Sequence, residues 1–129
     1  MKAYMSIQQV TEAMGVTAHT LRYYEKIGLL PSIERDASGY RRYTEEDLNW
    51  LKFITKLRES NMPIRDILQY GALIKEGNHT RAARKELLQQ HKEYIEQQMA
   101  LLQVGLEIVN EKIMYYQEKE KGDQGLCQT

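Results

Sequence analysis

Residues 17–43 read TAHTLRYYEKIGLLPSIERDASGYRRY, and this stretch decides the fold of the first part of the chain. Thr17 is a good N-cap residue for a helix, and Gly28 is a good residue to end one. The run Leu29-Leu30-Pro31 then leaves the helix in extended conformation, and residues 36–39 (Asp-Ala-Ser-Gly) are a turn signal. The pattern predicts a helix of about three turns followed by a small β-hairpin, or wing.

The predicted helix at 17–28 has two different faces. Its inward face carries Thr20, Leu21, Tyr24 and Ile27. Its outward face follows the i, i+3, i+4, i+7 spacing with His19, Arg22, Tyr23 and Lys26. Such a face suits the major groove of DNA, although many ordinary solvated helix faces have the same composition.

The return arm of the predicted hairpin carries Tyr40, Arg41, Arg42 and Tyr43. Successive side chains of a strand point to opposite sides, so Arg41 and Arg42 point apart. One of them can contact a phosphate while the other fixes the hairpin to the domain. The sequence does not say which arginine does which, and a surface ion pair on an ordinary hairpin is the alternative.

A first helix precedes this stretch. Ser6 and Gln9 have the spacing of a capping box, Ile7 and Val10 follow at helical positions, and Gly15 ends the segment. Two helices joined by a tight turn that contains glycine are typical of a helix-turn-helix motif.

Two further helices complete the predicted first domain. Thr44 is an N-cap followed by three acidic residues, and the helix that it opens carries the apolar side chains Trp50, Phe53, Ile54 and Leu57, which we assign to the core. Residues 61–63 break this helix. Pro63 suits the first position of a fourth helix, which residues 75–78 close.

From about Thr80 to Lys121 the sequence is helical without proline. Apolar residues recur in it with coiled-coil spacing at Leu88, Ile95, Met99, Leu102, Leu106, Val109, Ile113 and Tyr116. A helix of this length, roughly 60 Å, is too long to be buried against a small domain. The simplest partner is the same helix of a second chain, so the pattern predicts a homodimer. An adjoining apolar stripe widens this face: Leu87, Tyr94, Leu101, Ile108 and Tyr115.

Composition narrows the function classes. The net charge is zero, but residues 17–43 hold five Lys and Arg against three Asp and Glu, which concentrates cations where DNA contact is predicted. The chain has neither an apolar run of membrane-spanning length nor a signal peptide, so we expect a soluble cytoplasmic protein. Cys127 is the only cysteine. We find no nucleophile with a base, metal-ligand cluster or phosphate loop, and therefore expect neither an enzyme, a cofactor nor a metal site.

These motifs together resemble the MerR family of bacterial transcriptional regulators. The resemblance rests on Ser6-Ile7 with the helix end at Gly15, on the run LRYYE-x-x-GLL-P at 21–31, on GYRRYT at 39–44 and on Asp47-Leu48. It covers about residues 5–70 by motif, and the long helix matches the family by architecture.

The resemblance implies a homodimer, joined by an antiparallel coiled coil, that binds an inverted repeat in double-stranded promoter DNA. Family members bend and untwist a promoter with an over-long spacer so that RNA polymerase can use it. By position, the resemblance implies that these residues contact DNA: Thr17, His19, Arg22 and Tyr23 at the groove or its flanking phosphates, Tyr40 and Arg41 in the wing, and Arg58 on the backbone. The roles of Lys26 and Arg42 rest on the residue pattern rather than on the resemblance.

We therefore predict a mostly α protein. It comprises a winged helix-turn-helix domain with a small β-hairpin wing at 1–76, a long coiled-coil dimerisation helix at 77–121 and a flexible tail at 122–129. The cysteines of metal-sensing relatives and the separate ligand domain of drug-sensing relatives have no counterpart here, so the signal stays open. Two other classes compete with a transcriptional regulator: an architectural DNA-bending protein of the excisionase type, and a coiled-coil adaptor.

Overall fold

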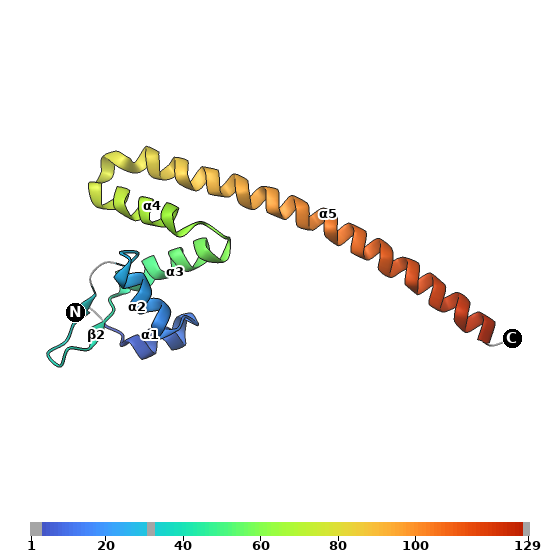
Figure 1. Ribbon diagram of the computed structural model, residues 1–129, viewed down its shortest axis with the longest axis horizontal. Helices are drawn as coiled ribbons and strands as arrows, with labels where there is room; N and C mark the ends of the chain where they lie inside the picture. The colour runs from blue at the N-terminus through green and yellow to red at the C-terminus, as the bar shows by residue number, and fades with distance from the viewer. Residues whose placement is uncertain (1–3, 31–32, 128–129) are drawn as a thin grey trace. The chain divides into compact units, whose positions relative to one another are not determined.

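The computed structural model describes residues 4–30 and 33–127, with side chains up to residue 123. The chain divides into two compact units, Met1–Leu87 and Leu88–Thr129. The first unit holds four helices of the described residues, a two-stranded hairpin and the first turns of a long fifth helix, which continues through the second unit (Figure 1).

The helix-turn-helix is formed by α1 (Ile7–Met14) and α2 (Ala18–Lys26). The predicted capping box is confirmed, because Ser6 and Gln9 each accept a hydrogen bond from the other's backbone N–H. Gly15 ends α1 in the left-handed region at φ 67°, where glycine carries no Cβ penalty. Val10 of α1 and Leu21 of α2 are fully buried, which fixes the two helices to the core.

α2 begins as predicted at the N-cap Thr17 but ends two residues before Gly28, at Lys26. Leu29 and Leu30 both donate their backbone N–H to the carbonyl oxygen of Tyr24, at 2.8 and 3.2 Å. These bonds turn the chain sharply at the end of α2. Both leucines are buried, so the link after α2 is part of the core.

The wing consists of β1 (Glu34–Arg35) and β2 (Arg41–Arg42), paired antiparallel with Glu34 opposite Arg42 and Arg35 opposite Arg41. The predicted hairpin is thus confirmed. The sequence did not reveal that Met5 pairs with Tyr43 through two backbone hydrogen bonds of 2.8 and 2.9 Å. This bridge attaches the start of the described chain to the return arm of the wing.

α3 (Glu45–Glu59) and α4 (Ile64–Glu76) complete the first unit. Thr44 is the N-cap of α3 as predicted, and it also forms a capping box with Asp47 that was not predicted from the sequence. The prediction that Pro63 is the first residue of α4 was wrong by one position, because its ψ of 144° is extended and makes it the N-cap. The core residues of the first unit come from α1 to α4, from the links after α2 and α3, and from the positions that flank the wing: Val10, Leu21, Leu29, Leu30, Ile33, Tyr43, Leu51, Ile54, Leu57, Met62 and Ile67.

After a short 3-10 turn, η1 (Asn78–Thr80), the helix α5 runs from Arg81 to Cys127 without a break. The predicted flexible tail at 122–129 is therefore wrong for residues 122–127, which continue the helix. Each glycine there costs only about 1 kcal/mol of helix propensity, too little to end a helix already formed. Among the described residues, no helix is long and apolar enough to cross a membrane.

Candidate DNA-binding and dimerisation surfaces

The outward face of α2, defined as His19, Arg22, Tyr23 and Lys26, is exposed as predicted. Tyr23 is 45% exposed, and its ring lies 6.2 Å from that of Tyr24. Within the part of the chain that the structure describes, Arg22 and Lys26 make no ion pair. The cations of the α2 face are therefore available to an external anion.

Thr17 is exposed but already has partners inside the chain. Its hydroxyl oxygen accepts the N–H of Thr20 at 3.1 Å and lies 2.9 Å from the hydroxyl of Thr20. Its first role is to begin α2. A contact from Thr17 to DNA stays a prediction, and such a contact must be compatible with this cap.

Arg41 links the wing to α2. Its Nε donates to Oε2 of Glu25 at 2.7 Å, and both side chains are only about one fifth exposed (22% and 20%). A short, partly desolvated ion pair resists solvent screening better than a surface pair. Arg41 therefore fixes the wing beside α2, and its remaining guanidinium N–H groups are the ones left for a phosphate.

Arg42, on the other side of β2, is held within the wing region. Its guanidinium lies 4.2 Å above the ring of Tyr4 and 3.6 Å from the carboxylate of Glu34. Its Nε is buried and has no hydrogen-bond partner among the described residues. The sequence predicted that one arginine of this pair would be structural, and the structure gives both of them partners inside the protein.

The tip of the wing is ordered by Asp36 and presents Tyr40. The carboxylate of Asp36 accepts the backbone N–H groups of Ser38 and Tyr40 at 2.9 and 3.0 Å. Gly39 takes φ 86°, and its carbonyl accepts from Arg35 at 2.8 Å. Tyr40 is 73% exposed, so the wing offers an aromatic hydroxyl to a partner.

Arg58, predicted to contact the DNA backbone, donates from Nη1 to the carbonyl oxygen of Met62 at 2.7 Å. This bond closes the turn between α3 and α4, where Asn61 has a positive φ of 68°. Arg58 is half-buried. Its contact with DNA stays a prediction, and its position in the turn is what the structure adds.

Tyr43 is a site residue whose properties the sequence did not reveal. It is 1% exposed, and its hydroxyl is buried with no hydrogen-bond partner among the described residues. Burial raises the pKa of its phenol above the ordinary value of 10.0, and the nearby carboxylate of Glu25 raises it further. Tyr43 therefore stays neutral and anchors the end of the wing in the core.

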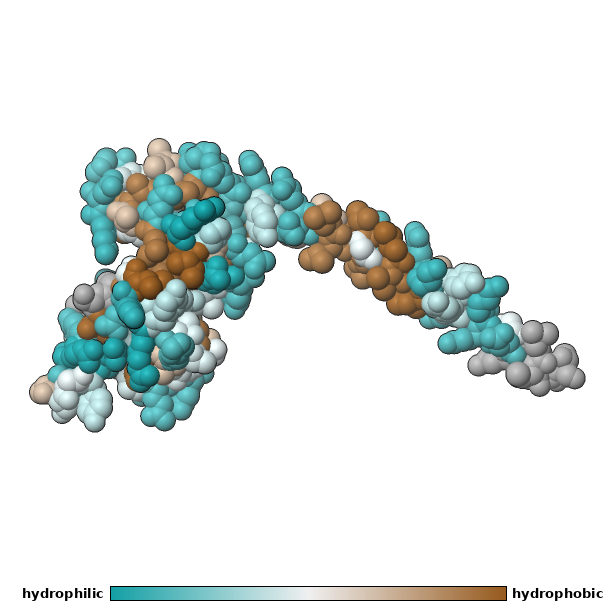
Figure 2. All heavy atoms as spheres, in the orientation of Figure 1, coloured by the Kyte–Doolittle hydropathy of each residue, from teal (hydrophilic) through white to brown (hydrophobic). Residues whose placement is uncertain are grey.

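The predicted dimerisation residues form an apolar stripe on α5. Leu88 and Ile95 are half-buried within the single chain, and the other members are exposed by 48–73%: Met99, Leu102, Leu106, Val109, Ile113 and Tyr116. The adjoining residues Leu101, Ile108 and Tyr115 are exposed by 51–66%. Figure 2 shows hydrophobic atoms gathered along the middle of this helix. A contiguous apolar surface of this kind marks an association site.

No group of three or more His, Cys, Asp or Glu side chains that could hold a metal ion occurs among the described residues. The first unit presents an exposed basic helix with a wing fixed beside it, and α5 of the second unit carries an exposed apolar stripe. A winged helix-turn-helix with these surfaces is the architecture of a DNA-binding regulatory protein.

The chain belongs to the MerR family of helix-turn-helix regulatory proteins. Residues 5–71 match the family model described as "MerR HTH family regulatory protein", and residues 48–105 match the model "MerR, DNA binding". The first match includes α1 to α3 with the wing and most of α4, and the second continues into α5. The family resemblance predicted from the motifs is thus confirmed.

Named relatives are transcriptional regulators. The chain is 45% identical over 84 residues to the HTH-type transcriptional regulator AdhR of Bacillus subtilis. The matched region covers 65% of this chain and 60% of AdhR. It is 34% identical over 110 residues to an uncharacterized HTH-type transcriptional regulator of Haemophilus influenzae, covering 85% of this chain and 82% of that protein.

Solved structures confirm the fold class. The crystal structure of HiNmlR, a MerR family regulator lacking the sensor domain and bound to promoter DNA, matches with a TM-score of 0.82 and 32% identity over 90% of this chain and 92% of that one. A putative MerR family regulator from Listeria monocytogenes matches with a TM-score of 0.84 and 34% identity over 97% and 99%. The excisionase-type alternative finds no support in these relatives.

Proposed function

We propose that this protein is a homodimeric, sequence-specific regulator of transcription that acts on promoter DNA in the cytoplasm. The observation that carries the proposal is the ion pair between Arg41 and Glu25, which fixes the wing beside α2. It holds Tyr40 at a set distance from the exposed face of α2. A rigid pair of contacts suits the major groove and its adjacent phosphate backbone.

Within this function, the residues divide into two groups. His19, Arg22, Tyr23 and Lys26 are exposed on α2 and provide base or phosphate contacts. Thr17, Arg41, Arg42 and Arg58 have partners inside the protein and position the contacting elements, with their free hydrogen-bonding groups as secondary DNA contacts. Tyr40 contacts the backbone from the wing.

The apolar stripe on α5 supports a homodimer. Two recognition helices related by a twofold axis read two half-sites, so the target is an inverted repeat. HiNmlR is seen bound to promoter DNA, and the similarity of the two chains supports the same class of target here. We further propose that the dimer acts as an activator by bending and untwisting its promoter for RNA polymerase, as the family resemblance implies.

The test starts with selection of bound sequences from a random duplex library, because the operator is unknown. The selected site should be an inverted repeat, and a footprint should extend over both halves. In sedimentation the protein should have twice its chain mass of 15.2 kDa. Absence of a preferred sequence would leave only an architectural role, and in vitro transcription with RNA polymerase then tests activation on the selected promoter.

A further inference from the structure

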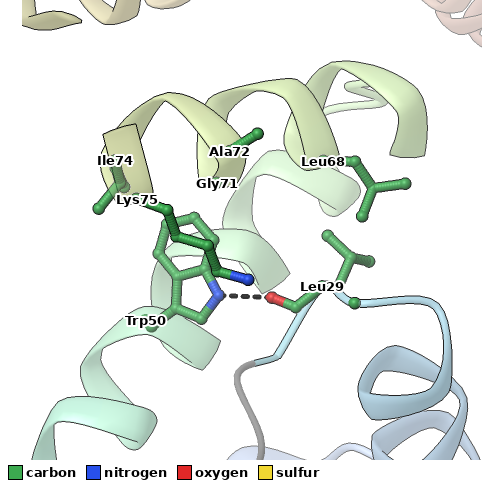
Figure 3. A pocket seen from close by; sticks show the side chains of 8 residues that line it. Leu29, Trp50, Leu68, Gly71, Ala72, Ile74 and Lys75 are labelled. Carbon is green, nitrogen blue, oxygen red and sulfur yellow. Dashed lines mark hydrogen bonds between the residues drawn. The ribbon is translucent and has the colours of Figure 1, made fainter. Parts of the chain in front are cut away.

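A cavity of about 490 Å³ lies in the first unit, between the end of α2, the start of α3 and one side of α4 (Figure 3). Its lining is mostly apolar and comprises Gly28, Leu29, Trp50, Leu68, Gly71, Ala72, Ile74 and Lys75. Cavities of this size and composition are typical of small-molecule sites. None of the proposed DNA-contacting residues lines it.

One wall of the cavity is a fixed aromatic surface. The indole of Trp50 stacks on Tyr70 with 6.0 Å between ring centroids and 8° between planes, and Phe53 meets both rings edge-on. The indole N–H donates to the carbonyl oxygen of Leu29 at 2.7 Å. Because its single polar group is satisfied, Trp50 offers an apolar aromatic surface held in one orientation.

Gly71 of α4 lines the cavity beside Trp50, and its missing side chain leaves space there. A Cβ added at Gly71 would meet only Cζ2 of Trp50, at an ordinary contact distance of 3.7 Å. Glycine inside a helix is less favourable than alanine by about 1 kcal/mol. Since alanine fits here, packing within the chain does not require the glycine, and its effect is to leave the cavity larger.

One cation stands at the cavity. Lys75 is exposed, and no carboxylate among the described residues lies within ion-pair distance of its amino group. Lys75 lines the cavity together with Trp50, and both side chains are labelled in Figure 3. A bound anion would therefore have its charge at Lys75 and its apolar body against Trp50.

We propose that this cavity binds a small, planar, apolar molecule that carries one carboxylate. The aromatic wall and the aliphatic side chains of Leu68 and Ile74 take its body, and Lys75 takes its charge. The ligand would contact Leu29, which lies three residues after the end of α2, and α4, which leads into α5. A role of this ligand as an effector depends on the proposed regulatory function, whereas its binding to the cavity does not.

Binding can be measured directly, because Trp50 is the only tryptophan of the chain. The probe is 2-naphthoate, with the uncharged 2-naphthamide as its isostere, and the readouts are Trp50 fluorescence and titration calorimetry on the full chain. We expect saturable quenching by 2-naphthoate with Kd below about 1 mM, as for a compact ligand of this size. No saturable binding at this concentration would overturn the proposal and leave the proposed function untouched.

Two variants test the location. Gly71→Leu fills the space beside Trp50 and should weaken binding at least about tenfold, whereas Gln69→Leu adds the same side chain to an exposed position of α4 outside the cavity and should not. Lys75→Gln should lower the affinity for 2-naphthoate about threefold to fivefold and leave the affinity for 2-naphthamide unchanged. Lys52→Gln on α3 is the control for this variant. Equal binding by Gly71→Leu and the parent protein would overturn the assignment.

The competing occupant is a second copy of the chain. Sedimentation of Gly71→Leu distinguishes the two, because filling a small-molecule cavity should leave the dimer intact. If Gly71→Leu weakens the dimer while Gln69→Leu does not, the cavity belongs to the interface and the small-molecule assignment is wrong. Loss of sequence-specific DNA binding by the parent protein would instead count against the proposed function alone.

Discussion

Several leucine and isoleucine side chains are buried in the first unit of this chain, whereas several in the second unit are exposed. In the first unit Leu21, Ile54 and Ile67 are completely buried, whereas in α5 Leu102 is 73% exposed and Ile108 is 59% exposed. The first unit supplies its own apolar neighbours from four helices and a wing. Among the described residues of its own unit, the exposed part of α5 has no such neighbours. This contrast shows that the first unit builds its own core, whereas the apolar stripe of α5 is left exposed, and we predict that a partner chain removes this surface from water.

The largest expected effect comes from breaking the α5 stripe. Leu102→Glu should convert the dimer to a monomer, because a carboxylate in an apolar helix interface costs several kcal/mol when it is unpaired. Operator affinity should fall at least about a hundredfold, since one half-site alone then holds the protein. Sedimentation and fluorescence anisotropy measure the two effects.

Val104→Glu is the matched control for Leu102→Glu. Val104 is also on α5 and 54% exposed, but it lies two residues from the stripe and faces away from it. This variant should stay dimeric. Loss of the dimer in both variants would mean that any charge on the helix disrupts it and that the stripe is not the interface.

The next largest effect concerns the exposed face of the first unit. If Arg22 reads a base edge, Arg22→Ala should lose about 1–3 kcal/mol of binding free energy on the selected site and little on random duplex. The protein should remain folded, because Arg22 makes no ion pair with the described residues. Equal losses on both duplexes would make Arg22 a phosphate contact.

A smaller effect sharpens the role of Arg41. A double-mutant cycle with Arg41→Ala and Glu25→Ala should give a coupling of about 1–2 kcal/mol in the free energy of unfolding, since the pair is short and partly buried. Glu25→Ala should also weaken operator binding by freeing the wing. If only Arg41→Ala weakens operator binding, and the slope of log affinity against log salt concentration falls in magnitude by about one, Arg41 acts mainly on a phosphate.

The pKa of Tyr43 predicts a dependence of stability on pH. Below about pH 10 the phenol is neutral in both folded and unfolded chains. Above it the unfolded phenol ionises while the raised pKa keeps the buried one neutral, so the free energy of unfolding should decrease as pH rises, by at most about 1.4 kcal/mol per unit. Tyr43→Phe should remove this contribution.

At neutral pH Tyr43→Phe should be neutral or slightly stabilising, by up to about 1 kcal/mol, because the lost hydroxyl is buried without a partner among the described residues. Urea unfolding from pH 7 to 11 checks both statements, with the exposed Tyr23→Phe as control. A clear loss of stability at neutral pH would show that the hydroxyl of Tyr43 has a partner in solution.

Substitution of Cys127 is expected to have no effect. Cys127 is the only cysteine of the chain, so no second thiol within the chain can form a disulfide with it or share a metal ion. Cys127→Ser should leave operator affinity, the dimer and the response to the native inducer unchanged. A variant that binds its operator normally but no longer responds would identify Cys127 as the sensor.

Local sequence was sufficient for the boundaries set by capping and turn chemistry. Ser6 with Gln9, Gly15, Thr17 and Thr44 lie where the pattern predicted, because each acts on backbone groups within four residues. The α5 stripe was equally readable, since helical spacing alone places those residues on one side. Tail residues 122–127 were misread because glycines lower helix propensity without preventing a long helix from continuing.

Only the tertiary structure decided the partners that are distant in sequence. The pairs of Arg41 with Glu25, Trp50 with Leu29 and Met5 with Tyr43 join residues that no local pattern connects. An arginine in a motif reads as a DNA contact because its charge is visible in the sequence, whereas its ion pair inside the protein depends on how α2 and the wing meet. The sequence by itself determined which side chains α2 and α5 can present, and the packing of the first unit decided which arginines are held within the protein and where a cavity remains.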